Sequence, residues 1–195
     1  IANQVQFLLQ MVVTGAASGM GVIISQYWGK RQTEPIRRVF AVGFWISIIL
    51  SGVMSLVVWF KPYWVMGLLT NEQSIIPSGV EYLKIMVFSY LMFSISNSLL
   101  GVMRSVETVR IGFYISLSTL LINIFLNYAL IYGHFGAPEL GVKGAAYATL
   151  TSRAVEFLVS VIYCRLIDKK LRLKFKDIFA VKRNYIADFI RSGVP

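Results

Sequence analysis

Cysteine, histidine and carboxylate side chains are scarce in this sequence of 195 residues, which has one cysteine, one histidine and nine Asp plus Glu. Cys164 alone cannot form an internal disulfide, and it belongs to no metal-binding or redox motif. No two carboxylates lie within one helical turn, and no glycine-rich loop leads into a Lys-Ser or Lys-Thr pair that could hold a phosphate. These absences argue against an enzyme, and we expect no cofactor and no metal ion.

Charged residues are also few, at 14% of the chain, whereas 56% of the residues are hydrophobic and the mean hydropathy is +0.67. A soluble helical protein would carry charges along the outer face of each helix, and residues 39–60 contain none. We attribute the net charge of +10 to basic segments that face anionic lipid, rather than to nucleic-acid binding. The composition therefore predicts a membrane protein that contacts lipid and does not bind nucleic acid.

Five segments are long and apolar enough to cross a bilayer. The hydrocarbon core is about 30 Å thick, so a helix that rises about 1.5 Å per residue needs roughly 20 apolar residues to span it. Unpaired backbone amides are costly in lipid, so the segments must be helices or barrel strands, and their length favours helices. Residues 61–80 are predicted to form a short amphipathic segment in the outer interface. The predicted fold is an all-α, polytopic membrane helix bundle with spans at residues 4–28, 39–60, 82–103, 111–132 and 145–166.

Lysine and arginine are distributed unevenly between the connections, with fifteen on one side of the predicted membrane and three on the other. The basic connections are residues 29–38, 104–110 and 165–191, and the three opposite residues are Lys61, Lys84 and Lys143. Because positively charged loops stay in the cytoplasm, the basic connections are predicted to be cytoplasmic loops of a multi-pass protein of the cell membrane.

The fourth segment carries a polar stripe. Ser116, Thr119, Asn123 and Asn127 are spaced three, four and four residues apart, so at about 100° per residue they fall within roughly 80° of the helix circumference. Asparagine in hydrocarbon needs partners for its amide, which favours a water-filled cavity or a bound ion. The alternative is that the stripe joins this helix to a neighbour by hydrogen bonds, and spacing alone does not separate the two.

The fifth segment has a second polar face, which holds Thr149, Ser152 and Glu156, with Arg153 about a third of a turn or less away. A charge at mid-bilayer costs on the order of 3 kcal/mol, so neither Arg153 nor Glu156 is expected to face lipid. Either the two form an ion pair at i, i+3, or Glu156 is a protonatable group in a transport cavity. The candidates for ion or proton coupling are Asn123, Asn127, Thr149 and Glu156.

The third segment contributes serines and an asparagine beside several methionines. Methionine re-packs easily, so this helix would suit an adaptable drug-binding wall, although such residues also occur in an ordinary bundle interior. The candidates for lining a cavity are Ser89, Ser96, Asn97, Ser116, Thr119, Ser152 and Arg153.

Several stretches together resemble the multidrug and toxic compound extrusion (MATE) transporters over nearly the whole chain. They are residues 15–19 (GAASG), 24–29 (ISQYWG), Arg104 with Thr108, 123–133 (NIFLNYALIYG) and 136–149 (GAPELGVKGAAYAT). The resemblance implies that the five segments are the second to sixth helices of a twelve-helix protein with two six-helix lobes. Residues 1–168 would form the N-terminal-lobe bundle without its first helix, and residues 169–195 a basic cytoplasmic linker between the lobes and the start of the next helix.

The resemblance also implies a function. MATE transporters are antiporters that admit H⁺ or Na⁺ while they expel an organic, often cationic, drug through alternating access between the lobes. In the family an aspartate on the first helix forms an ion site with an asparagine on the fifth helix and a residue four positions later. Asn123 and Asn127 hold those two positions here, where some members carry Asp at the second. The helix with the aspartate is not in this chain, so the chain would hold half of the site.

Two functions other than drug antiport are alternatives for this chain. A flippase for lipid-linked oligosaccharide or peptidoglycan precursors, of the same broad superfamily, would need cationic residues in its cavity to meet a pyrophosphate, and Arg153 is the cation in the middle of the predicted spans. A channel-forming subunit would need a continuous polar lining without a connection between two lobes. For an antiporter the expected partners are lipid, small organic cations or drugs, and the remaining helices of the full-length protein.

Overall fold

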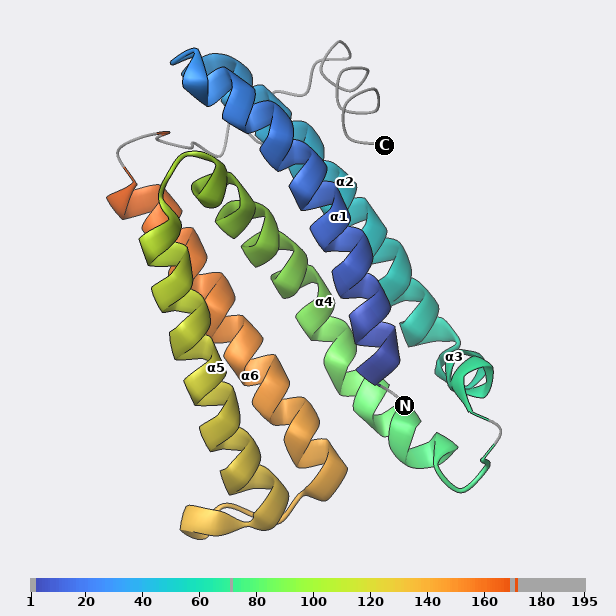
Figure 1. The fold of residues 1–195 in the computed structure, drawn as a ribbon. Helices are drawn as coiled ribbons and strands as arrows, with labels where there is room; N and C mark the ends of the chain where they lie inside the picture. The colour runs from blue at the N-terminus through green and yellow to red at the C-terminus, as the bar shows by residue number, and fades with distance from the viewer. Residues whose placement is uncertain (1–2, 71, 169–170, 172–195) are drawn as a thin grey trace.

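The computed structural model describes residues 3–70, 72–168 and 171, and these residues form helices and no strands (Figure 1). The helices are α1 (Asn3–Gly29), α2 (Thr33–Phe60), the short α3 (Pro62–Leu69), α4 (Ile76–Ser105), α5 (Val109–Tyr132) and α6 (Gly141–Ile162). A 3-10 turn, His134–Gly136, lies between α5 and α6, and one turn of π-helix, Tyr163–Ile167, follows α6. The predicted all-α bundle is confirmed.

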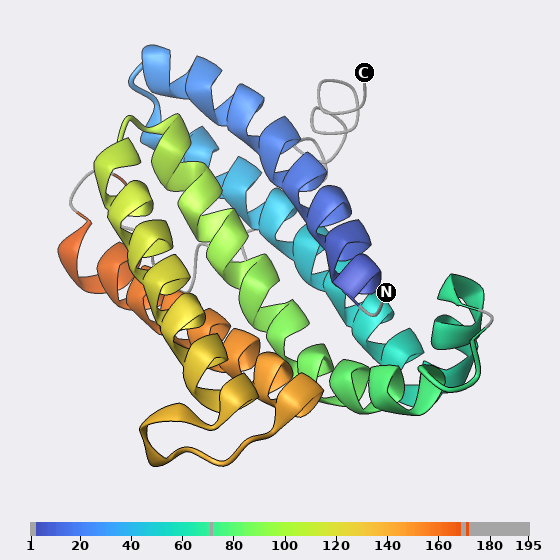
Figure 2. The ribbon, with the colours of Figure 1, turned by 60° about the horizontal axis from the view of Figure 1, so that its bottom comes forward.

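Helix α4 runs through the middle of the bundle. It packs against α1 and α2 on one side and against α6 on the other, while α5 packs mainly against α6 (Figures 1 and 2). Consecutive long helices are antiparallel. One end of the bundle, here called the Arg104 end, therefore holds Gly29, Arg104 and Val109, and the opposite end, the Asn3 end, holds Asn3 and Tyr132.

Two apolar clusters hold α1, α2 and α4 together. Near the Arg104 end, Met20 and Ile24 of α1 are buried with Phe40 of α2. Near the Asn3 end, Leu9 of α1 is buried with Leu83 of α4. In contrast, α5 turns large apolar side chains outward, as expected for a helix that faces lipid or further helices. The exposed apolar residues of α5 include Phe113, Leu117, Leu121, Ile124 and Phe125.

The predicted spans need two corrections. Among the described residues, α1, α2, α4 and α5 are long and apolar enough to cross a membrane, which makes four helices rather than five. The fifth predicted span, α6, has the length, but Lys143, Arg153 and Glu156 lower its apolar content. The interfacial segment predicted at 61–80 is also shorter, because α3 ends at Leu69 and residues 76–80 already belong to α4. A turn between them lets α4 begin with Pro77 in its first turn, where proline is tolerated.

Most of the predicted linker, residues 169–195, lies outside the described residues, but Leu171 is described and is 1% exposed. The Arg37 Nε of α2 donates a hydrogen bond to the Leu171 carbonyl at 2.9 Å. The Leu171 amide in turn donates to Asp168 Oδ2 at 3.1 Å. Leu171 is therefore held against the first turns of α2.

Gly144 lets α6 lie directly on the backbone of α5. A Cβ atom added at Gly144 would be 2.4 Å from the Leu130 carbonyl oxygen of α5. The same carbonyl accepts a hydrogen bond from the Leu140 amide at 2.9 Å, so it is fixed in place from a second direction. Gly15 of the glycine-rich α1 is different, since a Cβ atom there would meet nothing within 4 Å. At Gly144, therefore, a side chain of any size would press on the backbone of α5.

Candidate functional site

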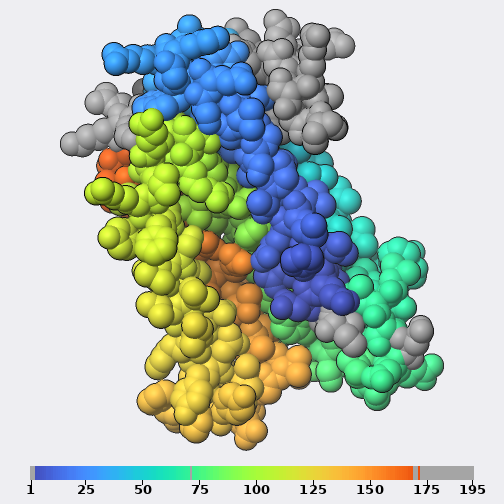
Figure 3. Space-filling view, viewed as in Figure 1, coloured from blue at the N-terminus to red at the C-terminus, as the bar shows by residue number. Residues whose placement is uncertain are grey.

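A polar cavity of about 580 Å³ lies between α1, α4, α5 and α6. In the space-filling view it corresponds to the hollow between α1 and α5, through which α6 is visible (Figure 3). We call it the main cavity. Its lining residues are Asn3, Gln6, Phe7, Gln10, Tyr82, Ser116, Thr119, Leu120, Asn123, Asn127, Ala145, Thr149, Ser152, Arg153 and Glu156.

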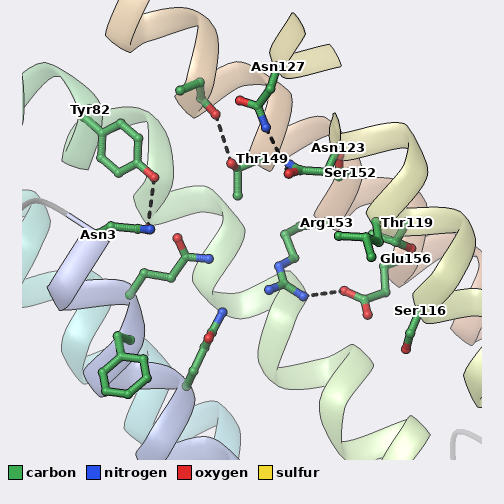
Figure 4. Close-up of a pocket in the computed structure, with 15 residues that line it drawn as sticks. Asn3, Tyr82, Ser116, Thr119, Asn123, Asn127, Thr149, Ser152, Arg153 and Glu156 are labelled. Atoms are coloured by element: carbon green, nitrogen blue, oxygen red, sulfur yellow. Dashed lines mark hydrogen bonds and ion pairs between the residues drawn. The ribbon is translucent and has the colours of Figure 1, made fainter. Parts of the chain in front are cut away.

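The whole polar stripe of α5 lines this cavity. Asn127 Nδ2 donates a hydrogen bond to Asn123 Oδ1 at 2.9 Å, so the two amides lie one turn apart and contact each other (Figure 4). The Thr119 hydroxyl donates to the Ile115 carbonyl of its own helix at 2.9 Å. Within the described chain these hydrogen bonds stay on α5, and both asparagines are only half-buried. The Asn127 oxygen and the outer lone pairs of Asn123 therefore remain open to the cavity.

The hydroxyl groups of α6 that line the cavity also donate their hydrogen bonds to the backbone of their own helix. The Thr149 hydroxyl donates to the Ala145 carbonyl at 2.9 Å, and the Ser152 hydroxyl donates to the Ala148 carbonyl at 2.8 Å. Hydroxyls bonded in this i−4 pattern keep acceptor capacity on their oxygen atoms. Both oxygens can thus serve as additional polar contacts for a guest in the cavity.

Arg153 and Glu156 form the predicted i, i+3 ion pair. Arg153 Nη1 donates to Glu156 Oε2 at 2.7 Å. The exposed fraction of the side chain is 21% for Arg153 and 8% for Glu156, so water screens this pair weakly. The guanidinium also lies over the Phe93 ring of α4, 4.7 Å from its centre, in a cation–π contact. Glu156 is the one carboxylate among the lining residues of the described chain.

Helices α1 and α4 contribute polar residues that the sequence analysis missed. Asn3, Gln6 and Gln10 line the cavity from α1, and the Tyr82 hydroxyl of α4 donates to Asn3 Oδ1 at 3.3 Å. The spacing of three and four residues between Asn3, Gln6 and Gln10 is the same signal that was used on the fourth segment. Applied to the first segment, it would have predicted this polar face.

The structure does not bring every candidate to the main cavity. Ser89 and Ser96 are buried in α4 and donate to the Met86 and Met92 carbonyls of their own helix, at 2.6 and 2.9 Å, away from the cavity lining. Asn97 lines a second cavity of about 320 Å³. The second cavity is lined by Phe93, Asn97, Leu100, Arg104, Val109, Gly112, Phe113, Ser116 and Glu156.

A helical bundle of membrane-crossing length with a polar interior cavity defines a polytopic membrane protein with a site for a polar or charged guest. The sequence pattern of the MatE family matches residues 1–129, and the chain belongs to this family. The resemblance to MATE transporters found in the sequence is therefore confirmed.

Curated relatives cover the chain almost completely. The chain is 29% identical to the probable multidrug resistance protein NorM of Thermotoga maritima, over 100% of this chain and 42% of that protein. It is 23% identical to the uncharacterized transporter YisQ of Bacillus subtilis, over 100% of this chain and 43% of that protein. The chain thus spans less than half the length of these relatives.

Solved structures share the fold. A multidrug resistance MATE family transporter of the MOP superfamily in an inward-facing conformation superposes with a TM-score of 0.86 at 21% identity, over 100% of this chain and 43% of that one. A MOP superfamily transporter from Pyrococcus furiosus superposes with a TM-score of 0.77 at 22% identity, also over 100% of this chain and 43% of that one. The binding pocket of that transporter is described as having reverse polarity, which suggests a different function. One fold thus carries cavities of different polarity, and function must be argued from the lining residues.

Proposed function

We propose that this chain forms most of the N-terminal lobe of a secondary active multidrug antiporter of the cell membrane. A proton or sodium ion would move inward while an organic, often cationic, drug moves outward, through alternating access between two lobes. The main cavity carries this proposal, because it gathers amide, hydroxyl and carboxylate oxygens from four helices at membrane depth. Relatives named as probable multidrug resistance proteins point to the same activity.

The chemistry of the lining favours a cation as the coupling species. Hard cations prefer carboxylate, amide and hydroxyl oxygens as ligands, and a carboxylate can also bind a proton. Asn123, Asn127, Thr149 and Glu156 present such oxygens from two adjacent helices. An aspartate on the helix that precedes this chain in the family would complete the set.

The flippase alternative is less well supported. A pyrophosphate headgroup would need free cationic donors in the cavity, and Arg153 is the single cation among the residues that line the main cavity of the described chain. Its guanidinium is already held by Glu156 and Phe93. The lining therefore presents oxygen acceptors rather than free positive charge.

Substitution of the two asparagines tests this function in the full-length protein. Asn123→Ala or Asn127→Ala should lower ion-driven efflux about tenfold, the loss expected when one contact to a charged ligand is removed. Transport should be measured in vesicles with proton and sodium gradients imposed separately. Membrane expression should stay near normal, because both side chains are half-buried and bond only to each other.

Ser118→Ala is the matched control, since Ser118 lies on the same helix, is exposed and lines neither cavity. Equal loss of expression and transport in the asparagine variants would contradict the proposal and indicate that the stripe serves packing.

The positive-inside distribution orients this lobe with the Arg104 end in the cytoplasm. In a Cys164→Ala background, cysteines at Thr33 and Thr108 should react with a membrane-impermeant maleimide from the cytoplasmic side only, and a cysteine at Ser74 from outside only. Thr33 and Thr108 lie at the Arg104 end, and Ser74 lies in the turn before α4 at the Asn3 end. Labelling of the Thr33 position from outside in intact cells would reverse the orientation.

A further inference from the structure

The two cavities meet inside the bundle. Ser116 of α5 and Glu156 of α6 line both of them. From this junction the main cavity extends toward the Asn3 end, where Asn3, Tyr82 and Asn127 line it. Together the cavities follow α5 from Val109 to Asn127.

The second cavity extends from the junction in the opposite direction. It reaches Arg104 in the last turn of α4 and Val109, the first residue of α5. Arg104 is exposed, so this cavity ends at the surface of the Arg104 end. Arg104 and Glu156 are the charged residues that line it in the described chain.

The boundary between the cavities consists of side chains that can move. Arg153 lines the main cavity, Phe93 lines the second cavity, and the Arg153 guanidinium lies between Glu156 and the Phe93 ring. Arg153 binds one carboxylate oxygen, Oε2, through a single nitrogen rather than in the stronger bidentate geometry. A cation that reaches Glu156 can compete for that oxygen without any movement of backbone.

Asn97 offers a polar contact on the far side of the junction. Its Nδ2 is buried and has no hydrogen-bond partner in the described chain. Buried donors of this kind are normally satisfied, so the unpaired one marks a place where a water molecule can bind, while the Asn97 carbonyl oxygen is the atom that could contact a cation. Asn97 lies on α4 one helical turn from Phe93, on the second-cavity side.

We propose that the Arg153–Glu156 pair is a gate through which the coupling cation passes from the main cavity to the second cavity and on to the Arg104 end. The cation binds the Glu156 carboxylate in place of Arg153, whose guanidinium keeps its contact with Phe93. The cation then leaves past Ser116 and Asn97, and the ion pair forms again. This inference rests on the proposed cation coupling and adds a route through the lobe, with Glu156 as the shared ligand.

Reversal of the pair separates a gate from a structural ion pair. In the full-length protein, Arg153→Glu with Glu156→Arg keeps one charge of each sign on α6, but it places the guanidinium at the junction of the cavities. A structural pair would tolerate this reversal. If the pair is a gate, ion-driven efflux of ethidium should fall at least about tenfold in this variant. Efflux is measured in proteoliposomes with proton and sodium gradients applied separately. The melting temperature should stay near that of the wild type.

The control is the same reversal at Glu81 and Lys143, an ion pair between α4 and α6 at 3.2 Å that is half-exposed and lines neither cavity. It should leave efflux unchanged. Ser116→Val is a second variant that narrows the junction without touching the ion pair, and it should slow cation-driven efflux while Ser118→Val does not.

Native efflux in the reversed Arg153–Glu156 variant would overturn the gate, and so would an equal loss in the Glu81–Lys143 control. If the reversed variant does not fold, native efflux by Ser116→Val overturns the gate and slowed efflux supports it. Absence of any ion-driven efflux in the wild type would instead contradict the proposed function itself.

Discussion

Replacing Arg153 with methionine in the full-length protein is expected to lower the yield of folded protein roughly tenfold, and replacing Glu156 with methionine as well is expected to restore it. The single substitution leaves the Glu156 carboxylate, 8% exposed, without its partner. Stranding one member of a buried pair costs about 3–5 kcal/mol, whereas replacing both members by apolar residues is often neutral. The free energy of unfolding should therefore recover in the double variant.

Fluorescence-detected gel filtration of detergent extracts over a temperature series measures this effect. The pair Glu81→Met with Lys143→Met is the control, because those side chains are about half-exposed and should contribute less than about 1 kcal/mol. A double Arg153–Glu156 variant no more stable than Arg153→Met would show that the two residues are not coupled. A stable double variant that no longer transports would assign the pair a role in transport rather than in folding alone.

Gly144→Ala is expected to have the second large effect, a loss of several kcal/mol in the stability of the α5–α6 pair. The added Cβ would lie 2.4 Å from the Leu130 carbonyl oxygen and 2.7 Å from its carbon. The contact is with backbone, and the Leu140 amide already holds that carbonyl, so the helices must separate. Overpacking that shifts backbone typically costs about 1–3 kcal/mol and more where the backbone cannot relax.

Gly15→Ala and Gly52→Ala are the matched controls, because a Cβ atom at either helical position meets nothing within 4 Å. Alanine there should be neutral or stabilise by about 0.5–1 kcal/mol through its higher helix propensity. The melting temperature of each variant provides the comparison. An unchanged melting temperature for Gly144→Ala would mean that α5 and α6 can move apart without cost.

The helices were predictable from the sequence because length and apolar content are sufficient to identify a span. The first four spans agree with the structure to within a few residues at most ends, and the exceptions are the starts of α2 and α4, which lie six residues earlier than predicted. Those starts carry polar residues such as Thr33 and Glu81, which a hydropathy argument excludes although a helix can extend beyond the hydrocarbon. For α6 the same argument overstated the apolar content, because the residues that face the cavity are polar.

The site was predictable only in part, since periodicity identifies a polar face but not the neighbours of that face. The α5 stripe and the Arg153–Glu156 pair were found because both lie within one helix. The serines of α4 were assigned to a cavity because the third predicted segment also carries methionines that re-pack easily. In the structure Ser89 and Ser96 instead donate hydrogen bonds to the backbone of their own helix. Phe93 could not be connected to Arg153 from spacing, because their contact joins two helices.

The hydrogen bond from Arg37 to the Leu171 carbonyl has a mechanical consequence. A load applied at Leu171 would be shared by α2, through this hydrogen bond, and by α6, through the chain. Because α2 packs against α1 and α4, part of such a load would reach that side of the bundle.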